Sequence, residues 1–198
     1  MNKKEITIET YNNAPEEYAL KFNNLNRDKD IEEVFELCKV KDPKVFEIGC
    51  GNGRDAKKIL EYTDNYLGLD MSEKFLELAK EQNLGAEFVW GDIENFEVPK
   101  NLDIVFAFAS LLHSPREEFQ KIIDKVYDSL NLGGLVRISL KYSKSYEEFE
   151  KVESTGVRYF YLYSKEDIKE LCKGFKILKL KVNNLLGNDW LEVLLQKE

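Results

Sequence analysis

The chain has few of the residues that build metal and disulfide sites. Among its 198 residues are one histidine and three cysteines, Cys38, Cys50 and Cys172, which lie far apart and form no Cys-x-x-Cys pair. We therefore expect no metal and no structural zinc site. We interpret the cysteines as small buried residues of a protein in a reducing compartment.

Long apolar runs and an excess of positive charge are also missing. The longest apolar stretch, residues 104–112, has about nine residues, whereas a membrane span needs roughly 20. The opening residues MNKKEITIETYNN lack the apolar core of a secretory signal. The net charge is −8, and the lysines are dispersed among glutamates. We expect a cytoplasmic protein that binds neither membranes nor nucleic acid.

The composition is that of one folded domain, with 43% hydrophobic residues, 12 Phe and 10 Tyr. Short apolar runs alternate with amphipathic segments along the chain. Strands are predicted at 45–48, 66–69, 86–90, 103–109, 135–141, 175–182 and 190–195, and helices at about 16–25, 30–38, 54–62, 72–82, 117–130 and 164–172. The alternation predicts an α/β fold, a mostly parallel sheet between two helical layers.

The arrangement of the strands at the edge of this sheet follows from the lengths of the connections between them. Only residues 183–189 join the last two runs, too few for a crossover helix, so we expect an antiparallel hairpin at one edge. The last strand then lies beside the strand at 135–141, and the predicted strand order is 3-2-1-4-5-7-6. The run at 103–109 is continuously apolar, which is typical of a central strand buried on both faces.

A glycine-rich loop follows the first strand. Its sequence is Glu47-Ile-Gly49-Cys-Gly51-Asn-Gly53-Arg-Asp55, and its glycines allow the backbone to turn tightly and approach a ligand. The nicotinamide fingerprint GxGxxG fits poorly, because Arg54 stands at the third glycine position. The carboxylate of Glu47 would repel a pyrophosphate and suits a cationic ligand.

Acidic residues follow the next two strands. Asp70 comes about 20 residues after the glycines, where a doubly wound fold places an acid that accepts the ribose hydroxyls, while Ser72 suits the N-cap of the next helix. Asp92 follows the third strand, where a carboxylate can accept the exocyclic amine of adenine and Ile93 can pack on the ring. Either acid alone would be an ordinary cap or turn residue; together they predict a nucleoside site.

Five segments stand in the order and spacing of a known family. They are EIGCGNGRDA, GLDMSEKFLELAK, FVWGDIENF, DIVFAFASLLHSP and LNLGGLVRISLK. Over almost its whole length the chain resembles the class I (Rossmann-like, seven-stranded) S-adenosylmethionine-dependent methyltransferases, and within them the small bacterial enzymes that act on small molecules. The resemblance implies S-adenosylmethionine as co-substrate, S-adenosylhomocysteine as product, and direct in-line transfer of a methyl group to a small-molecule acceptor.

The resemblance also implies cofactor contacts at particular positions. These are Gly49, Gly51 and Gly53 along the methionine moiety, Glu47 near its ammonium, Asp70 at the ribose, Met71, Asp92 and Ile93 around the adenine, Phe108 and Ala109 near the sulfonium, and Tyr11 and Tyr18 folded over the ligand. For the two tyrosines, ordinary packing of an N-terminal helix is the alternative.

Four residues are candidates for the acceptor side. His113, the only histidine, follows the fourth strand and could take a proton from the acceptor, or could cap the helix that starts at Ser114-Pro115. Lys141, Arg158 and Tyr159 are candidates to flank the acceptor, which would favour an anionic or aromatic molecule. The alternatives are solvated side chains for the two basic residues and the core of a lid for Tyr159.

The implied organisation is one methyltransferase domain over residues 1–198. Residues 1–44 form an N-terminal helical cap, 45–141 the cofactor-binding core, 142–163 an aromatic and irregular lid on the acceptor side, and 164–198 the last helix and edge hairpin. We expect a monomer or homodimer. Two other functions stay open at this point: a module that binds the cofactor without turnover and regulates or scaffolds a partner, and a nicotinamide-dependent oxidoreductase, which Arg54 disfavours.

Overall fold

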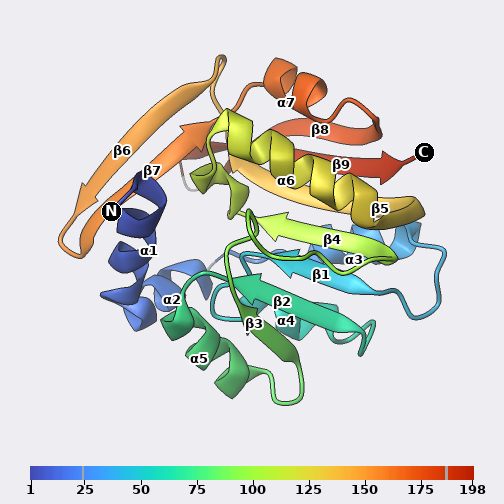
Figure 1. The fold of residues 1–198 in the computed structure, drawn as a ribbon, viewed down its shortest axis with the longest axis horizontal. Coiled ribbons are helices and arrows are strands. Elements are labelled where there is room, and N and C mark those ends of the chain that lie inside the picture. Colours follow the sequence, from blue (N-terminus) through green and yellow to red (C-terminus); the bar gives the residue numbers. More distant parts are fainter. Residues whose placement is uncertain (24, 186) are drawn as a thin grey trace.

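Seven strands of the computed structural model form one sheet, which the helices cover on both sides (Figure 1). The structure describes residues 1–23, 25–185 and 187–198. Its helices are α1 (Lys3–Asn12), α2 (Pro15–Asn23), α3 (Asp28–Leu37), α4 (Arg54–Ile59), α5 (Glu73–Gln82), α6 (Arg116–Ser129) and α7 (Lys165–Leu171), with a short 3₁₀ helix η1 (Leu111–His113). Its strands are β1 (Val45–Ile48), β2 (Tyr66–Asp70), β3 (Glu87–Trp90), β4 (Leu102–Phe108), β5 (Leu130–Lys141), β6 (Glu147–Glu153), β7 (Gly156–Leu162), β8 (Phe175–Leu185) and β9 (Asn188–Lys197).

The strand order of the main sheet is β3-β2-β1-β4-β5-β9-β8. The first five strands are parallel, and β9 pairs antiparallel with both β5 and β8. The last two strands therefore form the predicted edge hairpin, with the final strand beside β5. The predicted fold class and order are confirmed, since β8 and β9 are the sixth and seventh strands of the prediction.

Side chains alternate between the two faces of the sheet, and each face has its own helical layer. Val45, Ile104 and Phe106 pack against α3, α4 and α5. Phe46, Val105 and Val136 point to the opposite face and pack against α6 and α7. The central strand β4 is almost wholly buried, as its continuous apolar run predicts.

The N-terminal helix and the end of α6 differ from the sequence prediction. Helix α1 was not predicted, although Asn2 and Glu5 form a capping box at its start. Helix α6 ends at Ser129, one residue before its predicted end at Leu130, and β5 starts at Leu130 and not at Leu135 as predicted. The physical reason is that Leu130 is already extended and pairs with Leu102, so β5 begins there.

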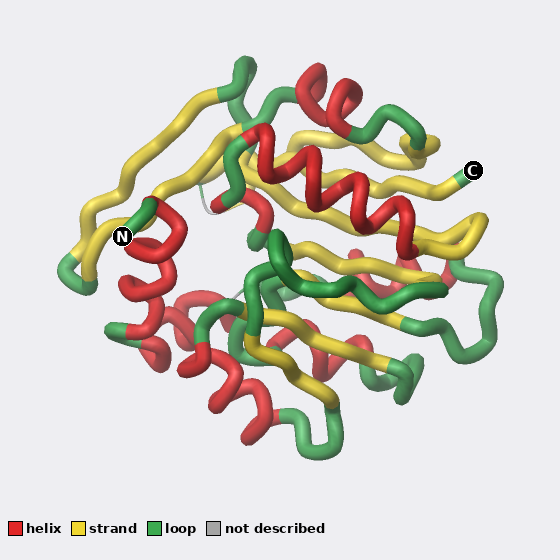
Figure 2. The backbone as a smooth tube through the Cα atoms, viewed as in Figure 1, coloured by secondary structure: helices red, strands yellow, loops and turns green. Residues whose placement is uncertain are grey.

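The expectation of an irregular segment at 142–163 is wrong. Strands β6 and β7 pair antiparallel in register from Glu147↔Leu162 to Glu153↔Gly156, forming a second, two-stranded sheet. Figure 2 shows this hairpin apart from the main sheet, next to the N-terminal helix. The sequence of β6, EEFEKVE, gives no apolar face because the strand is exposed and gains its order from pairing with β7.

Helix α1 is attached to β7 through two threonine hydroxyls. Thr10 Oγ1 accepts a hydrogen bond from the N–H of Val157 (2.9 Å), and Thr7 Oγ1 accepts one from the N–H of Tyr159 (3.0 Å). The α1 helix and the β6–β7 hairpin thus form one cover, which lies at the end of the sheet toward which β4 points (Figure 1). None of the described helices is long and apolar enough to span a bilayer.

Candidate functional site

A cavity of about 440 Å³ lies at the carboxyl ends of β1, β2, β4 and β5, beneath α1 and the β6–β7 hairpin. Most of the residues proposed from the sequence line it. They are Tyr11, Gly49, Gly51, Asp70, Met71, Asp92, Ile93, Phe108, Ala109, His113, Lys141 and Arg158. Four others, Tyr18, Glu47, Gly53 and Tyr159, do not belong to the lining. This is the edge at which open α/β sheets bind ligands.

The glycine-rich loop follows β1 with left-handed backbone conformations that suit glycine. Gly49 has φ +72°, and a Cβ there would come within 2.3 Å of the Cβ of Ser110. Gly51 has φ +55°, and a Cβ there would meet nothing within 4 Å. The loop is thus pressed against the end of β4 at Gly49 and open at Gly51, where a ligand can approach the backbone.

Asp70, at the end of β2, is held in place by the backbone on both sides. Its Oδ2 accepts the N–H of Gly51 and its Oδ1 accepts the N–H of Ser72, both at 2.8 Å. Burial raises the pKa of Asp70, and these hydrogen bonds oppose that shift. Each carboxylate oxygen can accept more than one hydrogen bond, so the side chain can also accept hydroxyl groups of a ligand. The predicted N-cap Ser72 is confirmed, since its hydroxyl accepts the N–H of Phe75.

A lysine that the sequence analysis missed meets Asp92. The Nζ of Lys4, on α1, lies 2.8 Å from Asp92 and 2.7 Å from Glu118. Burial opposes the charged form of Lys4, but hydrogen bonds to these two carboxylates raise its pKa. The capping box at Asn2 is the sequence signal that could have placed Lys4 on a helix. Asp92 therefore lines the cavity and also binds α1 through its ion pair with Lys4.

Two residues of the glycine motif turn away from the cavity. Glu47 is buried and accepts a hydrogen bond from the Tyr66 hydroxyl at 2.5 Å. Burial, and next the nearby carboxylate of Asp55, raise the pKa of Glu47 to about 8. Gly53 packs against α5, where a Cβ would come within 3.0 Å of Ala79. The structure gives Gly53 a role in helix packing, and the proximity of Glu47 to a ligand ammonium stays a prediction.

The end of β4 has a strained backbone. Ala109 has φ +53°, which is uncommon for a residue with a Cβ, and its N–H donates to the carbonyl and the hydroxyl of Ser139 at 3.1 and 3.0 Å. Strain of this kind persists only where the surrounding structure fixes it, and it clusters at functional sites. Phe108 and Ala109 thereby present a fixed wall to the middle of the cavity.

Both ring nitrogens of His113 are engaged. Nδ1 lies 2.6 Å from the carbonyl oxygen of Tyr159, which can only accept, so Nδ1 carries the proton. Nε2 lies 2.9 Å from the hydroxyl of Tyr11, which donates to it. The pKa of His113 is lowered to about 4, chiefly by burial and also by the cations Arg158 and Lys141, while the hydrogen bond to the Tyr159 carbonyl opposes the shift. The imidazole is neutral and joins η1 to the cover.

Arg158 lies in the cavity wall but is already paired. Its Nε donates to Glu153 at 2.7 Å and its Nη1 donates to the Tyr11 hydroxyl at 3.1 Å. Tyr18 stands behind Tyr11, with ring centroids 4.9 Å apart, and donates to Glu153. Tyr159 does not line the cavity, because side chains alternate along β7 and Arg158 and Phe160 face the cavity; an acceptor contact of Tyr159 stays a prediction.

Lys141 ends β5 between two aromatic rings. Its Nζ lies 5.3 Å from the ring centroid of Trp190 and 5.4 Å from that of Phe160. Trp190 is opposite Lys141 in the β5–β9 pairing. The sequence predicts that these strands are neighbours but not their register, so Trp190 was missed.

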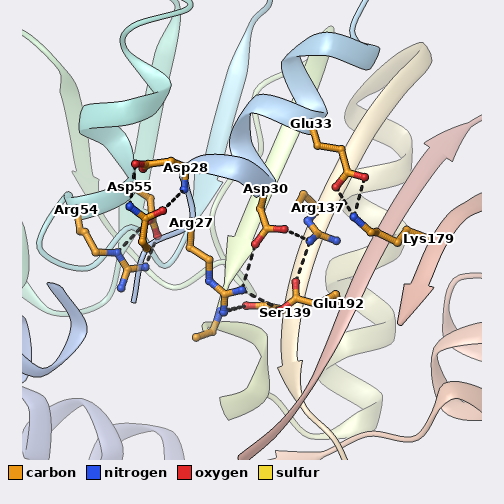
Figure 3. A network of polar contacts seen from close by, with 12 residues as sticks. Arg27, Asp28, Asp30, Glu33, Arg54, Asp55, Arg137, Ser139, Lys179 and Glu192 are labelled. Carbon is orange, nitrogen blue, oxygen red and sulfur yellow. Dashed lines mark hydrogen bonds and ion pairs between the residues drawn. The ribbon is translucent and has the colours of Figure 1, made fainter. Parts of the chain in front are cut away.

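Arg27, just before α3, was also missed. Its guanidinium packs over the rings of Phe108 and Trp190, at 5.5 and 5.7 Å. It donates to Glu192 at 2.9 Å and to Ser139 at 3.2 Å, within the buried polar network that Figure 3 shows. Neither its isolated position in the sequence nor its charge signals a buried residue. Among the described residues, no three His, Cys, Asp or Glu side chains gather as a metal-binding group.

Comparison with known proteins gives matches of two kinds. Residues 45–134 match the family described as a methyltransferase domain. The chain is 28% identical over 156 residues to malonyl-[acyl-carrier protein] O-methyltransferase 1 of Ilyobacter polytropus, which covers 74% of this chain and 58% of that enzyme. It is 28% identical over 99 residues to trans-aconitate 2-methyltransferase of Rhizobium leguminosarum, covering 49% of this chain and 38% of that enzyme. The chain thus spans less than two thirds of these relatives.

Solved structures share the whole fold at low sequence identity. Magnesium protoporphyrin IX methyltransferase from Synechocystis, with bound S-adenosylmethionine, superposes with a TM-score of 0.75 and 15% identity, covering 100% of this chain and 98% of that one. An S-adenosylmethionine-dependent methyltransferase from Clostridium acetobutylicum gives a TM-score of 0.71 and 16% identity, covering 91% and 98%. The predicted resemblance to the methyltransferase fold is confirmed.

Proposed function

We propose that this chain, which resembles the class I S-adenosylmethionine-dependent methyltransferases in motif order and in fold, transfers a methyl group from S-adenosylmethionine to a small-molecule acceptor. The observation that carries the proposal is the joint position of Gly51, Asp70 and Asp92 on the wall of one cavity, at the carboxyl ends of three neighbouring strands. The open space at the Cβ position of Gly51 and two carboxylates held in place suit an adenosine with a charged tail.

The residues present fit this cofactor. The unfilled space at Gly51 leaves room beside the loop backbone, and the Asp70 carboxylate, held by Gly51 and Ser72, can accept the two ribose hydroxyls. Asp92 would accept the adenine amine, with Ile93 and Met71 on the ring faces. Phe108 and Ala109 would border the sulfonium. When bound, S-adenosylmethionine would supply an electrophilic methyl group, which the acceptor would attack at carbon with the cofactor sulfur as the leaving group.

The chain's part in such a transfer is orientation and the exclusion of water. Direct displacement depends on holding the acceptor in line about 3–3.5 Å from the methyl carbon. Helix α1 and the β6–β7 hairpin cover the cavity, and Tyr11 and Arg158 link them above it. The names of the two relatives give malonyl-[acyl-carrier protein] and trans-aconitate as the compounds that those enzymes methylate, which supports methyl transfer without naming the acceptor of this chain.

Thermal unfolding with S-adenosylmethionine, S-adenosylhomocysteine, NAD or no ligand tests the cofactor. A ligand at about 100 times its dissociation constant adds roughly 2.7 kcal/mol to the free energy of unfolding, a shift of several degrees at this size. We expect a shift with both adenosyl sulfur compounds and none with NAD. A shift with NAD alone would contradict the proposed cofactor. Binding without S-adenosylhomocysteine release, over a panel of small acids, phenols, amines and thiols, would favour the module without turnover.

A further inference from the structure

We propose that the acceptor is a small carboxylic acid with an apolar body, bound as its carboxylate by Lys141 and methylated on a carboxylate oxygen. The inference rests on the methyl transfer proposed above and adds the class of the acceptor. Two independent features of the cavity carry it: a cation without a counter-ion at one end, and the lack of an available base.

The cation is Lys141. Its Nζ has a long contact of 3.4 Å to the amide oxygen of Asn188 and lies over the rings of Trp190 and Phe160. Within the described chain, no carboxylate forms an ion pair with it. A half-buried ammonium between aromatic rings, on the wall of a cavity, recognises an anion whose remaining surface is apolar.

The charges around Lys141 do not compensate its positive charge. The neighbouring network holds five cations and three carboxylates: Arg27, Arg137, Lys141, Lys151 and Arg158 against Asp30, Glu153 and Glu192. Figure 3 shows that Arg27 and Arg137 share Asp30 and Glu192. Glu153 forms ion pairs with both Lys151 and Arg158. The acceptor end is therefore positive in a chain whose net charge is −8.

The opposite end of the cavity has the acidic groups. Asp70 ends β2 and Asp92 follows β3. Lys141 and Trp190 belong to β5 and β9, on the other side of the central pair β1 and β4. This separation gives the nucleoside and the acceptor different ends of one cavity. The acceptor end then meets the nucleoside end at Phe108 and Ala109.

The second feature is that the described groups able to take a proton are already engaged. His113 accepts from Tyr11 at Nε2 and has its proton at Nδ1. The lining carboxylates each bind a cation or backbone N–H groups: Asp55 binds Arg54, Asp70 binds Gly51 and Ser72, and Asp92 and Glu118 bind Lys4. Burial raises the pKa of the Cys50 thiol well above its ordinary value.

A carboxylic acid needs none of these groups. Its ordinary pKa of about 4 leaves it ionised at neutral pH, whereas a phenol, thiol or ammonium must first lose a proton. In the transfer, one carboxylate oxygen forms the new bond to the methyl carbon while the carbon–sulfur bond breaks and its electron pair remains on sulfur. The carboxylate and sulfonium charges are both neutralised, no proton is released, and the products are a methyl ester and S-adenosylhomocysteine.

The acceptor class is tested with matched compounds. Purified protein is given S-adenosylmethionine labelled in the methyl group, with 3-phenylpropanoate, hexanoate or succinate, or with 3-phenylpropanol, 3-phenylpropanamide, phenol, aniline or thiophenol. Alkaline treatment releases labelled methanol from methyl esters but not from ethers, amines or thioethers. We expect alkali-labile label with at least one carboxylate and none with the matched alcohol and amide. Label that appears only in alkali-stable products would overturn the proposal.

Variants of Lys141 test recognition apart from turnover. The change Lys141→Met keeps an unbranched side chain between the rings and removes the charge, and Lys141→Arg keeps the charge. With S-adenosylhomocysteine bound, we expect Lys141→Met to weaken the binding of the active carboxylate at least tenfold by calorimetry and Lys141→Arg to restore most of it. Lys144→Met, at an exposed position three residues away, is the matched control and should bind as the unmodified protein does.

The outcomes separate this inference from the proposed function. If S-adenosylhomocysteine binds to the unmodified protein and to Lys141→Met with affinities within twofold, the cofactor site of the variant is intact. A change in carboxylate affinity then reports on the acceptor site alone. Equal carboxylate binding by Lys141→Met and the unmodified protein would overturn the role of Lys141. Failure of S-adenosylhomocysteine to bind the unmodified protein would overturn the proposed function itself.

Discussion

The hydroxyl of Tyr11 and the Nε2 atom of His113 lie 2.9 Å apart, although the residues are 102 positions apart in the sequence. The contact joins α1 to η1 directly above the cavity, and the second nitrogen of His113 joins η1 to β7. Arg158 donates to the same Tyr11 hydroxyl. The only histidine of the chain therefore connects the cover to the sheet in its neutral form, which is why its effect on stability depends on pH.

Replacing His113 by Gln should change how stability varies with pH. The pKa of His113 is about 4 in the folded protein and near 6.5 in the unfolded chain, because burial disfavours the imidazolium. The unfolded chain binds the extra proton between these values, so the free energy of unfolding falls as the pH falls from about 6.5 to 4. The full effect is about 3 kcal/mol.

Urea unfolding of both proteins at pH 7, 6, 5 and 4 measures this. The loss below pH 6.5 should be smaller in His113→Gln, and because the other titrating groups are common to both proteins, the difference between the two profiles isolates the histidine. Parallel profiles would mean that His113 titrates normally in the folded protein.

The change Thr10→Val should loosen the cover from the hairpin. The buried Thr10 hydroxyl accepts the N–H of Val157, and valine would leave that N–H without its partner. An unsatisfied buried donor costs about 1–3 kcal/mol. We expect a lower denaturation midpoint and faster amide exchange in residues 156–160. Thr10→Ser keeps the hydroxyl and should recover most of the loss, and Glu9→Gln, exposed on the same helix, is the control; full stability of Thr10→Val would refute the attachment.

Asp70→Ala should weaken the binding of S-adenosylmethionine by about 1.5–3 kcal/mol, the range for hydrogen bonds to a charged group. Calorimetry with S-adenosylhomocysteine measures the dissociation constant, and far-ultraviolet circular dichroism checks that the fold is kept. Asp128→Ala, exposed on α6 and remote from the cavity, should bind normally. Unchanged affinity in a folded Asp70→Ala protein would place the ribose elsewhere.

Glu192→Gln should destabilise the fold strongly. The Glu192 carboxylate lies 2.9 Å from Arg27 and 3.0 Å from Arg137, and all three side chains are buried. Removing one charge leaves two buried guanidinium groups to share Asp30, and breaking a buried ion pair costs about 3–5 kcal/mol. Urea denaturation measures the midpoints of Glu192→Gln and of the control Glu198→Gln. Glu198 forms an exposed ion pair with Lys176, which should contribute below about 1 kcal/mol to the free energy of unfolding. Equal midpoints for the two variants would show that the network contributes little.

The sequence by itself determined the arrangement of the sheet and the positions from which its ligand residues come. The parallel core and the edge hairpin follow from apolar runs and connection lengths, which are local properties of the chain. The same holds for Gly51, Asp70 and Asp92, because residues at the carboxyl ends of neighbouring parallel strands meet at one edge of the sheet. Their binding roles remain predictions until a ligand is measured.

Tertiary structure alone decided which side chains face the cavity and in what charge state. Tyr159 and Phe160 are neighbours in sequence, but the two-residue period of β7 turns only Phe160 inward. The sequence predicts a ligand-facing carboxylate at Glu47, yet burial and the nearby carboxylate of Asp55 raise its pKa to about 8. The pairing of Lys141 with Trp190 depends on strand register, and the engagement of His113 depends on the docking of α1. Burial, register and docking arise from contacts between segments far apart in the chain, and no local pattern encodes them.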